Sequence, residues 1–272
     1  MKLLKSNLVA LTFVSLFVPA VLAQDFEKGW DAWVEKNYVT ALKDFRPLAE
    51  QGHVRAQTIL GSAYYEGNGV TQNYANAAKW YRQAAEQGSS WAQAKLASMH
   101  MKGEGVTQDY SEGIKWYRMA AEGGSSLSQI LLGRIYREGE AIEKDPGEAV
   151  KWYRMAADGE RWSAMAQNEL GDMHRYGEGV IQDYVEAVKW YRMAAEAGSP
   201  NAQFNLAKML LAGQGVIQDN VYAHMWLNIA ASLGHGFAEE YRDEIARKMS
   251  VADISEAQRL ARECVRTDYI GC

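Results

Sequence analysis

Residues 89–124 read SSWAQAKLASMHMKGEGVTQDYSEGIKWYRMAAEGG. Two segments of this stretch flank a glycine-rich turn, GEGV. In the first segment Ala92, Leu96 and Met99 follow one another at intervals of four and three residues, which is the spacing of one helix face. The stretch therefore predicts two helices joined by a tight turn, each with one buried face.

The same unit recurs through the middle of the chain. The block Lys-Trp-Tyr-Arg occurs four times, with its tryptophans 36, 36 and 38 residues apart, and Trp226 follows 36 residues after the last of them. One hairpin of this size cannot bury its apolar face alone, so each repeat needs its neighbours. The prediction is an all-α fold, an α/α superhelical solenoid of helical hairpins with five repeats: 53–88, 89–124, 125–160, 161–198 and 199–234.

Residues at the helix ends support these boundaries. A serine N-cap is expected before the first helix of a repeat, most plainly where Ser199 precedes Pro200. Gly103 occupies the place of a left-handed residue that ends a first helix. The second helix opens on a capping box in three repeats: Asp109…Glu112, Asp145…Glu148 and Asp183…Glu186.

The Lys-Trp-Tyr-Arg blocks allow two interpretations. They could form a binding stripe of aromatic rings interleaved with cations, or they could recur because every repeat needs the same core. Alanine and glycine at fixed places let neighbouring helices approach closely, and bulky Trp, Tyr and Leu side chains then fill the gaps. This packing logic favours the core interpretation.

The flanking segments are expected to be atypical repeats. Residues 24–52 are predicted to form a shortened N-terminal repeat that lacks the G-x-G-V turn. Residues 235–272 are predicted to form a closing helical cap, with one helix at 235–248 and a last helix capped by Ser250 together with Asp253.

The first residues have the layout of a secretory signal peptide. Lysines precede an apolar run at 8–18, and Val21 and Ala23 supply small residues at the −3 and −1 positions of a cut. The alternative is an uncleaved membrane anchor, but the uncharged stretch 6–24 barely reaches the roughly 20 residues that a spanning helix needs. Residues 1–23 are thus predicted to be removed after Ala23. The mature chain is expected to be periplasmic or secreted, without stable membrane insertion.

Cys264 and Cys272 are the only cysteines of the chain. In an exported protein we expect them to form one disulfide that pins the C-terminal cap. The alternatives are a redox pair or half of a metal site. A separation of eight residues fits neither the C-x-x-C redox motif nor the usual zinc spacing.

Taken together, the repeat pattern A-x-x-x-L-G-x-x-Y-x-x-G-x-G-V-x-x-D-Y-x-x-A-x-x-W-Y-x-x-A-A-x-x-G resembles that of Sel1-like repeat proteins, relatives of the tetratricopeptide repeats. The resemblance covers 53–234. It implies an α-solenoid adaptor that holds protein partners, often in bacterial envelope or signalling contexts. Three departures concern local geometry: Asn73 replaces the capping Asp, Ala141 replaces the second turn glycine of its repeat, and Leu227 replaces the Tyr.

Several function classes are disfavoured by the sequence. The formal net charge of −5 argues against a nucleic-acid binder that works through bulk electrostatics. The chain has none of the G-x-S-x-G, H-E-x-x-H and phosphate-cradling motifs, and its histidines lack metal-ligand spacing. A cysteine-rich secreted branch of the family is associated with penicillin binding or β-lactam hydrolysis, but the repeats here contain no cysteine and no S-x-x-K or K-T-G. We therefore expect no enzymatic activity, no cofactor and no metal.

The resemblance to tetratricopeptide-like stacks also implies where a partner would bind. In such stacks the first helix of each pair lines an inner groove, and positions not used for packing face the ligand. By frame these predicted groove residues are Thr58, Ser62, Tyr65, Lys95, Ser98, Lys102, Arg134, Arg137, Asn168, Asp172, Arg175, Tyr176, Asn205 and Lys208.

The resulting hypothesis is an exported, non-enzymatic repeat scaffold that binds a protein or an extended peptide segment in its concave groove. Envelope proteins or peptidoglycan-associated factors are the expected kinds of partner. Two alternatives remain open: an envelope-polymer or β-lactam binding protein that regulates cell-wall processes, and a structural element that self-associates through its convex or end surfaces.

Overall fold

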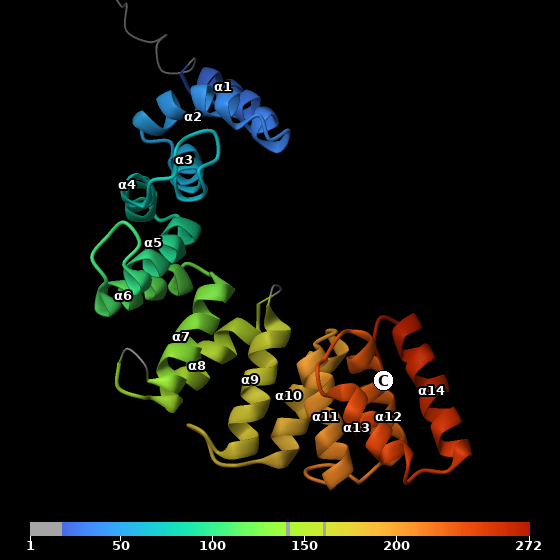
Figure 1. Cartoon of the computed structure of the whole chain (residues 1–272). Coiled ribbons are helices and arrows are strands. Elements are labelled where there is room, and N and C mark those ends of the chain that lie inside the picture. The colour runs from blue at the N-terminus through green and yellow to red at the C-terminus, as the bar shows by residue number, and fades with distance from the viewer. Residues whose placement is uncertain (1–17, 140–141, 160–161) are drawn as a thin grey trace, which may run out of the picture. The chain divides into compact units, whose positions relative to one another are not determined.

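The computed structural model describes residues 18–139, 142–159 and 162–272, and every regular element in these ranges is a helix (Figure 1). Most of the predicted signal peptide, residue 141 and the predicted repeat boundary at 160/161 lie outside them. The chain divides into two compact units, unit 1 ending at Gly124 and unit 2 running from Ser125 to Cys272.

Unit 1 is a succession of antiparallel helices, each packed against the next. Its helices are α1 (Val18–Val34), α2 (Tyr38–Glu50), α3 (Val54–Glu66), α4 (Tyr74–Glu86), α5 (Ser90–Lys102) and α6 (Tyr110–Glu122). The predicted cleavage point after Ala23 falls within the bounds of α1. Among the described residues, no helix is both long and apolar enough to cross a membrane.

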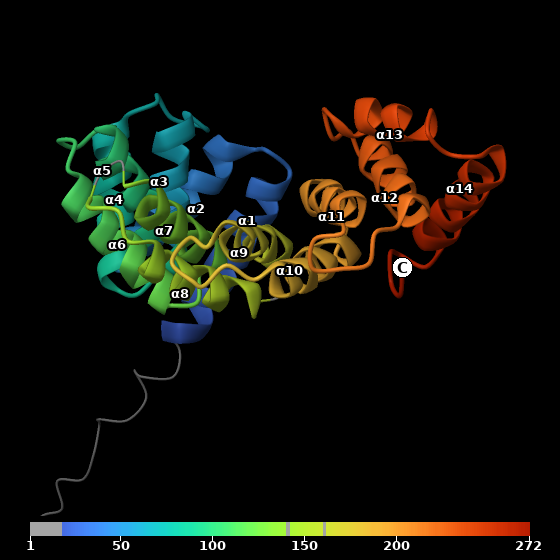
Figure 2. The same cartoon turned by 90° about the horizontal axis from the view of Figure 1, so that it is seen from below.

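Unit 2 continues the same pattern and adds the C-terminal helices. It contains α7 (Ser126–Glu138), α8 (Pro146–Ala157), α9 (Ser163–Tyr176), α10 (Tyr184–Glu196), α11 (Pro200–Ala212), α12 (Asn220–Ser232), α13 (Ala238–Ala246) and α14 (Val251–Arg266). Both α13 and α14 pack on α12 (Figure 2). The predicted all-α fold of consecutive helical hairpins is confirmed within each unit.

The two helices of a repeat approach closely where a tyrosine ring of the second lies on a glycine of the first. A Cβ on Gly61 would lie 2.5 Å from the Tyr81 ring, and one on Gly133 would lie 2.6 Å from the Tyr153 ring. Gly171 and Tyr191 repeat this contact. The rings of Tyr81, Tyr153 and Tyr191 are almost completely buried, at 1%, 1% and 0% exposed. The core interpretation is thus confirmed for these tyrosines of the Lys-Trp-Tyr-Arg blocks.

The helix starts follow the predicted capping signals with two exceptions. Ser89, Ser125 and Ser199 each cap a first helix, whereas α3 is capped by the imidazole of His53. Helix α9 begins after Trp162, which has φ 68° and makes no capping bond with its side chain. The expected serine cap is therefore wrong for these two helices.

The capping boxes of the second helices are half formed. The carboxylate of Asp109 accepts a bond from the backbone N–H of Glu112, as predicted. The return bond is not made, because the N–H of Asp109 already donates to the carbonyl of His100 at 2.9 Å. The glutamate instead pairs forward with Lys115. Asn73 caps α4 in the place of aspartate, so that departure preserves the cap.

The second glycine of the G-x-G turn packs against the preceding repeat. Gly105, between α5 and α6, has φ +70°, and a Cβ there would overlap the Tyr74 carbonyl at the start of α4. Gly69, Gly179 and Gly215 make the equivalent contact with the start of α2, α8 and α10. The turn therefore joins adjacent repeats as well as the two helices that it connects.

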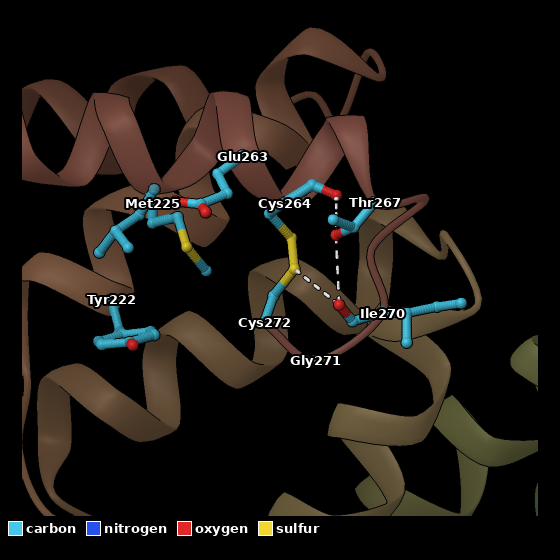
Figure 3. A pocket seen from close by; sticks show the side chains of 9 residues that line it. Tyr222, Met225, Glu263, Cys264, Thr267, Ile270, Gly271 and Cys272 are labelled. Carbon is cyan, nitrogen blue, oxygen red and sulfur yellow. Dashed lines mark hydrogen bonds between the residues drawn. A yellow bond between two sulfur atoms is a disulfide. The ribbon is translucent and has the colours of Figure 1, made fainter.

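The predicted disulfide is present and closes the C-terminal tail. Cys264 of α14 is bonded to Cys272, with 5.6 Å between their Cα atoms (Figure 3). The tail folds back so that the Tyr269 ring lies near Gly198, and it borders a hollow of about 190 Å³ with Tyr222 and Met225. The disulfide thus holds the tail against the last repeats of unit 2.

We predict that Gly105→Ala lowers the free energy of unfolding by more than about 2 kcal/mol, because alanine meets both the left-handed backbone and the Tyr74 carbonyl. Gly88→Ala is the matched control, since Gly88 has φ +90° and open space around a Cβ. Gly88→Ala should lower the free energy of unfolding by only about 1 kcal/mol. Urea unfolding of both variants measures the difference, and equal losses would contradict the close approach between repeats.

We also predict that replacing both cysteines, Cys264→Ser with Cys272→Ser, lowers the free energy of unfolding by about 2–3 kcal/mol, as expected for so short a loop in the chain-entropy model. Thermal unfolding with and without a reductant checks this. Reductant should lower the midpoint of thermal unfolding of the native chain and leave that of the double variant unchanged. An unchanged midpoint of the native chain in reductant would refute a stabilising role of the disulfide.

Candidate functional site

In repeats one and four, the residue after the Leu-Gly pair of the first helix bonds to the buried tyrosine of the same repeat. In repeat one the Tyr81 hydroxyl donates to Ser62 Oγ at 3.2 Å. In repeat four the Tyr191 hydroxyl donates to Asp172 Oδ1 at 2.6 Å. We call this register the hydroxyl-facing position; its members are Ser62, Ser98, Arg134, Asp172 and Lys208. The tyrosine ring belongs to the core, and its hydroxyl points toward the first-helix face.

In unit 1 the predicted groove residues form an aromatic and cationic cluster that joins α3 to α5. The Tyr65 hydroxyl donates to Glu104 at 2.7 Å, and this bond, with burial, raises the pKa of Tyr65 to about 12. The Lys95 ammonium lies 5.9 Å from the centre of the Tyr65 ring and 4.8 Å from the Trp91 ring. Trp91 is 48% exposed. Sequence reasoning missed Trp91 and Glu104.

The other predicted residues of unit 1 are less available to a partner. The Thr58 hydroxyl donates to the Val54 carbonyl at 2.8 Å and lies 3.5 Å from the Ser89 hydroxyl. Ser62 donates to the Thr58 carbonyl and accepts from Tyr81. Lys102 is exposed and lies 4.0 Å from Glu104. Ser98 is partly buried on α5.

In unit 2 a pocket of about 320 Å³ opens between α7 and α9. It is lined by Arg134, Arg137, Glu138, Lys144, Tyr153, Glu169 and Glu178. Arg137 binds two of these carboxylates, with Nη1 2.6 Å from Glu169 and Nε 2.6 Å from Glu178. Burial raises the pKa of Glu169, and the charge of Arg137 opposes that rise. Arg137 therefore ties α7 to the next repeat, and its donors are already engaged.

The remaining predicted residues of unit 2 cluster on α9 and α11. Asn205 donates to Asn168 Oδ1 at 3.0 Å, and Asn168 is buried. The Arg175 guanidinium lies 5.2 Å from the Tyr176 ring, which is 56% exposed. Burial, followed by the charge of Arg175, lowers the pKa of Lys208. The structure thus brings the positive charges of Arg175 and Lys208 together, and the negative charge of Asp172 partly offsets their effect on the pKa of Lys208.

One repeated feature of the sequence could have identified two of the residues that the sequence analysis missed. Glu104 and Glu178 occupy the same place in the G-E-G-V turns of repeats two and four, and each bonds to a first-helix side chain of the preceding repeat. Their recurrence marks them as contacts between repeats. Lys144 and Glu169 have no equivalent pattern.

The histidines do not form a metal site within the described part of the chain, where no three His, Cys, Asp or Glu side chains gather closely enough to hold an ion. His174 is buried with both ring nitrogens unpaired among the described residues, and its burial lowers its pKa. It therefore behaves as a neutral core residue near pH 7. His100 is also buried, with its Nε2 3.2 Å from the Arg82 guanidinium.

Comparison with known proteins supports the repeat assignment. The Sel1 repeat model matches residues 54–89, 92–125, 126–160, 164–199 and 200–235. The crystal structure of a Sel1 repeat protein from Oxalobacter formigenes is 32% identical, covers 81% of this chain and 87% of that chain, and superposes with a TM-score of 0.72. A protective antigen of uropathogenic Escherichia coli with an SLR fold is 27% identical over 91% of this chain and 70% of that chain, with a TM-score of 0.47. No curated protein matches the chain.

The family is shown by two independent findings. Five consecutive repeats match its model, and a solved relative shares 32% identity over most of both chains. Repeats of this kind commonly serve as protein-interaction scaffolds and are generally not catalytic. On these grounds the chain belongs to the Sel1 repeat family.

Proposed function

We propose that this chain is an exported, non-enzymatic scaffold that binds an extended segment of another protein along the first-helix face of its repeats. The observation that carries the proposal is the set of cations without ion pairs on that face, beside exposed aromatic rings. Lys95 lies beside Trp91 in unit 1, and Arg175 lies beside Tyr176 in unit 2. Neither cation forms a salt bridge with a described residue.

The chemistry of these clusters suits a peptide. Aromatic rings and arginines dominate the binding energy of protein interfaces, because they bury a large area and keep polar donors. Lysine and arginine can donate to the carbonyl and carboxylate oxygens that an extended segment presents. Each unit carries one such cluster, and each cluster by itself could contact a short stretch of a partner.

Export is supported by the disulfide, since disulfides form and persist in oxidising compartments. The signal-like composition of residues 1–23 is consistent with it. Both features fit a partner in the cell envelope.

We predict that Lys95→Glu combined with Arg175→Glu reduces partner capture at least about tenfold, because two donors become repelling acceptors. The measurement is crosslinking of the tagged, exported chain in intact cells, followed by quantitative mass spectrometry. The matched control, Lys79→Glu with Arg154→Glu, makes the same charge change at exposed positions of the second helices α4 and α8.

Equal capture by the two double variants would refute the first-helix face as the binding surface. The alternative role is tested with the same purified variants. Saturable binding of peptidoglycan fragments, or turnover of a chromogenic β-lactam, without any protein partner would favour an envelope-polymer or β-lactam binding protein.

A further inference from the structure

The pocket of unit 2 is lined by a buried tyrosine whose hydroxyl lacks an acceptor among the described residues. Tyr153 is 1% exposed and lines the pocket. Its counterparts Tyr81 and Tyr191 donate to Ser62 and Asp172. Tyr153 has no hydrogen-bond partner among the described residues. A hydroxyl in such a position, whose burial raises its pKa above the usual range, remains protonated and available as a donor at neutral pH.

The reason is the residue at the hydroxyl-facing position of this repeat. Where repeats one and four have an acceptor, repeat three has Arg134, which can only donate. Two donors, the Tyr153 hydroxyl and the Arg134 guanidinium, therefore line one pocket with no acceptor assigned to either. An acceptor supplied from outside could therefore bond to both donors without displacing any contact within the described part of the chain.

Two of the cations that line the pocket are available to pair with an anionic acceptor. Glu169 and Glu178 are both held by Arg137 at 2.6 Å. Of the remaining charged residues that line the pocket, Arg134 and Lys144 are positive and Glu138 is negative, and none of the three forms an ion pair with a described residue. The lining as a whole carries three positive and three negative charges, and Arg134 and Lys144 are the two cations in it that can pair with an anion.

We infer that this pocket binds a carboxylate of the peptide segment. The carboxylate accepts a hydrogen bond from the Tyr153 hydroxyl and forms an ion pair with Arg134. The inference rests on the proposed peptide-binding function and specifies its chemistry at one repeat. The carboxylate could belong to an aspartate or glutamate side chain or to the C-terminus of the partner, and the volume of about 320 Å³ accommodates either.

The test measures fluorescence anisotropy with three labelled 12-residue probes. The first alternates Glu and Ala and is acetylated and amidated, the second replaces every Glu by Gln, and the third is the Gln probe with a free C-terminus. The native chain is expected to bind the Glu probe, the free-terminus probe or both about tenfold more tightly than the blocked Gln probe. The favoured probe identifies the source of the carboxylate.

The variants are chosen so that binding and stability respond differently. Arg134→Ser recreates the Ser62 arrangement and gives Tyr153 an internal acceptor, so the midpoint of thermal unfolding should hold or rise while binding of the favoured probe falls about tenfold. Tyr153→Phe removes only the hydroxyl. It should weaken binding of the favoured probe about threefold or more and leave the midpoint of thermal unfolding unchanged. Arg154→Ser, at an exposed position of α8, is the charge-matched control and should bind as the native chain does.

Equal binding of all three probes by the native chain, or no binding of any, would overturn the inference. So would equal losses in Arg134→Ser and Arg154→Ser. These failures would leave the proposed scaffold function standing, because its crosslinking test depends on Lys95 and Arg175 and not on this pocket.

Discussion

In repeats one, three and four the helical hairpin depends on one contact, a tyrosine ring of the second helix lying against a glycine of the first. At Gly61, Gly133 and Gly171 any Cβ would meet the ring at about 2.5 Å, so no larger residue fits without separating the helices. Burying a side chain of this size contributes about 2–3 kcal/mol. The contact sets the distance between the two helices of these three hairpins, whereas repeats two and five have Ala97 and Ala207 in the place of the glycine.

The same tyrosine connects the core to the surface. Its ring recurs in repeats one to four, while its hydroxyl reaches a position where the residue varies from repeat to repeat. Ser62 and Asp172 satisfy the hydroxyl internally, and Arg134 leaves it available. Repeat five has Lys208 at this position and the buried Leu227 in the place of the tyrosine, so it has no hydroxyl there at all. A constant core can therefore present a different binding chemistry in each repeat.

The predictable part of the fold was the part encoded by short-range spacing. The hairpins, the aspartate caps of the second helices and the family followed from a period of about 36 residues and from signals within one helix turn. The capping boxes show where this reasoning fails. Asp109 caps its helix as expected, but its own N–H is taken by His100, a residue of the preceding helix. No local pattern indicates that competition.

The sequence by itself predicted which residues of the first helices are not used for packing within a repeat, because helical periodicity assigns a side chain to a face without reference to the rest of the chain. Only the tertiary structure decided which of them are already engaged. Arg137 pairs with residues 32 and 41 positions away, and Asn205 with one 37 positions away. These contacts depend on how one repeat is placed against the next, and that placement arises from packing summed over many side chains. A single helix carries no record of it.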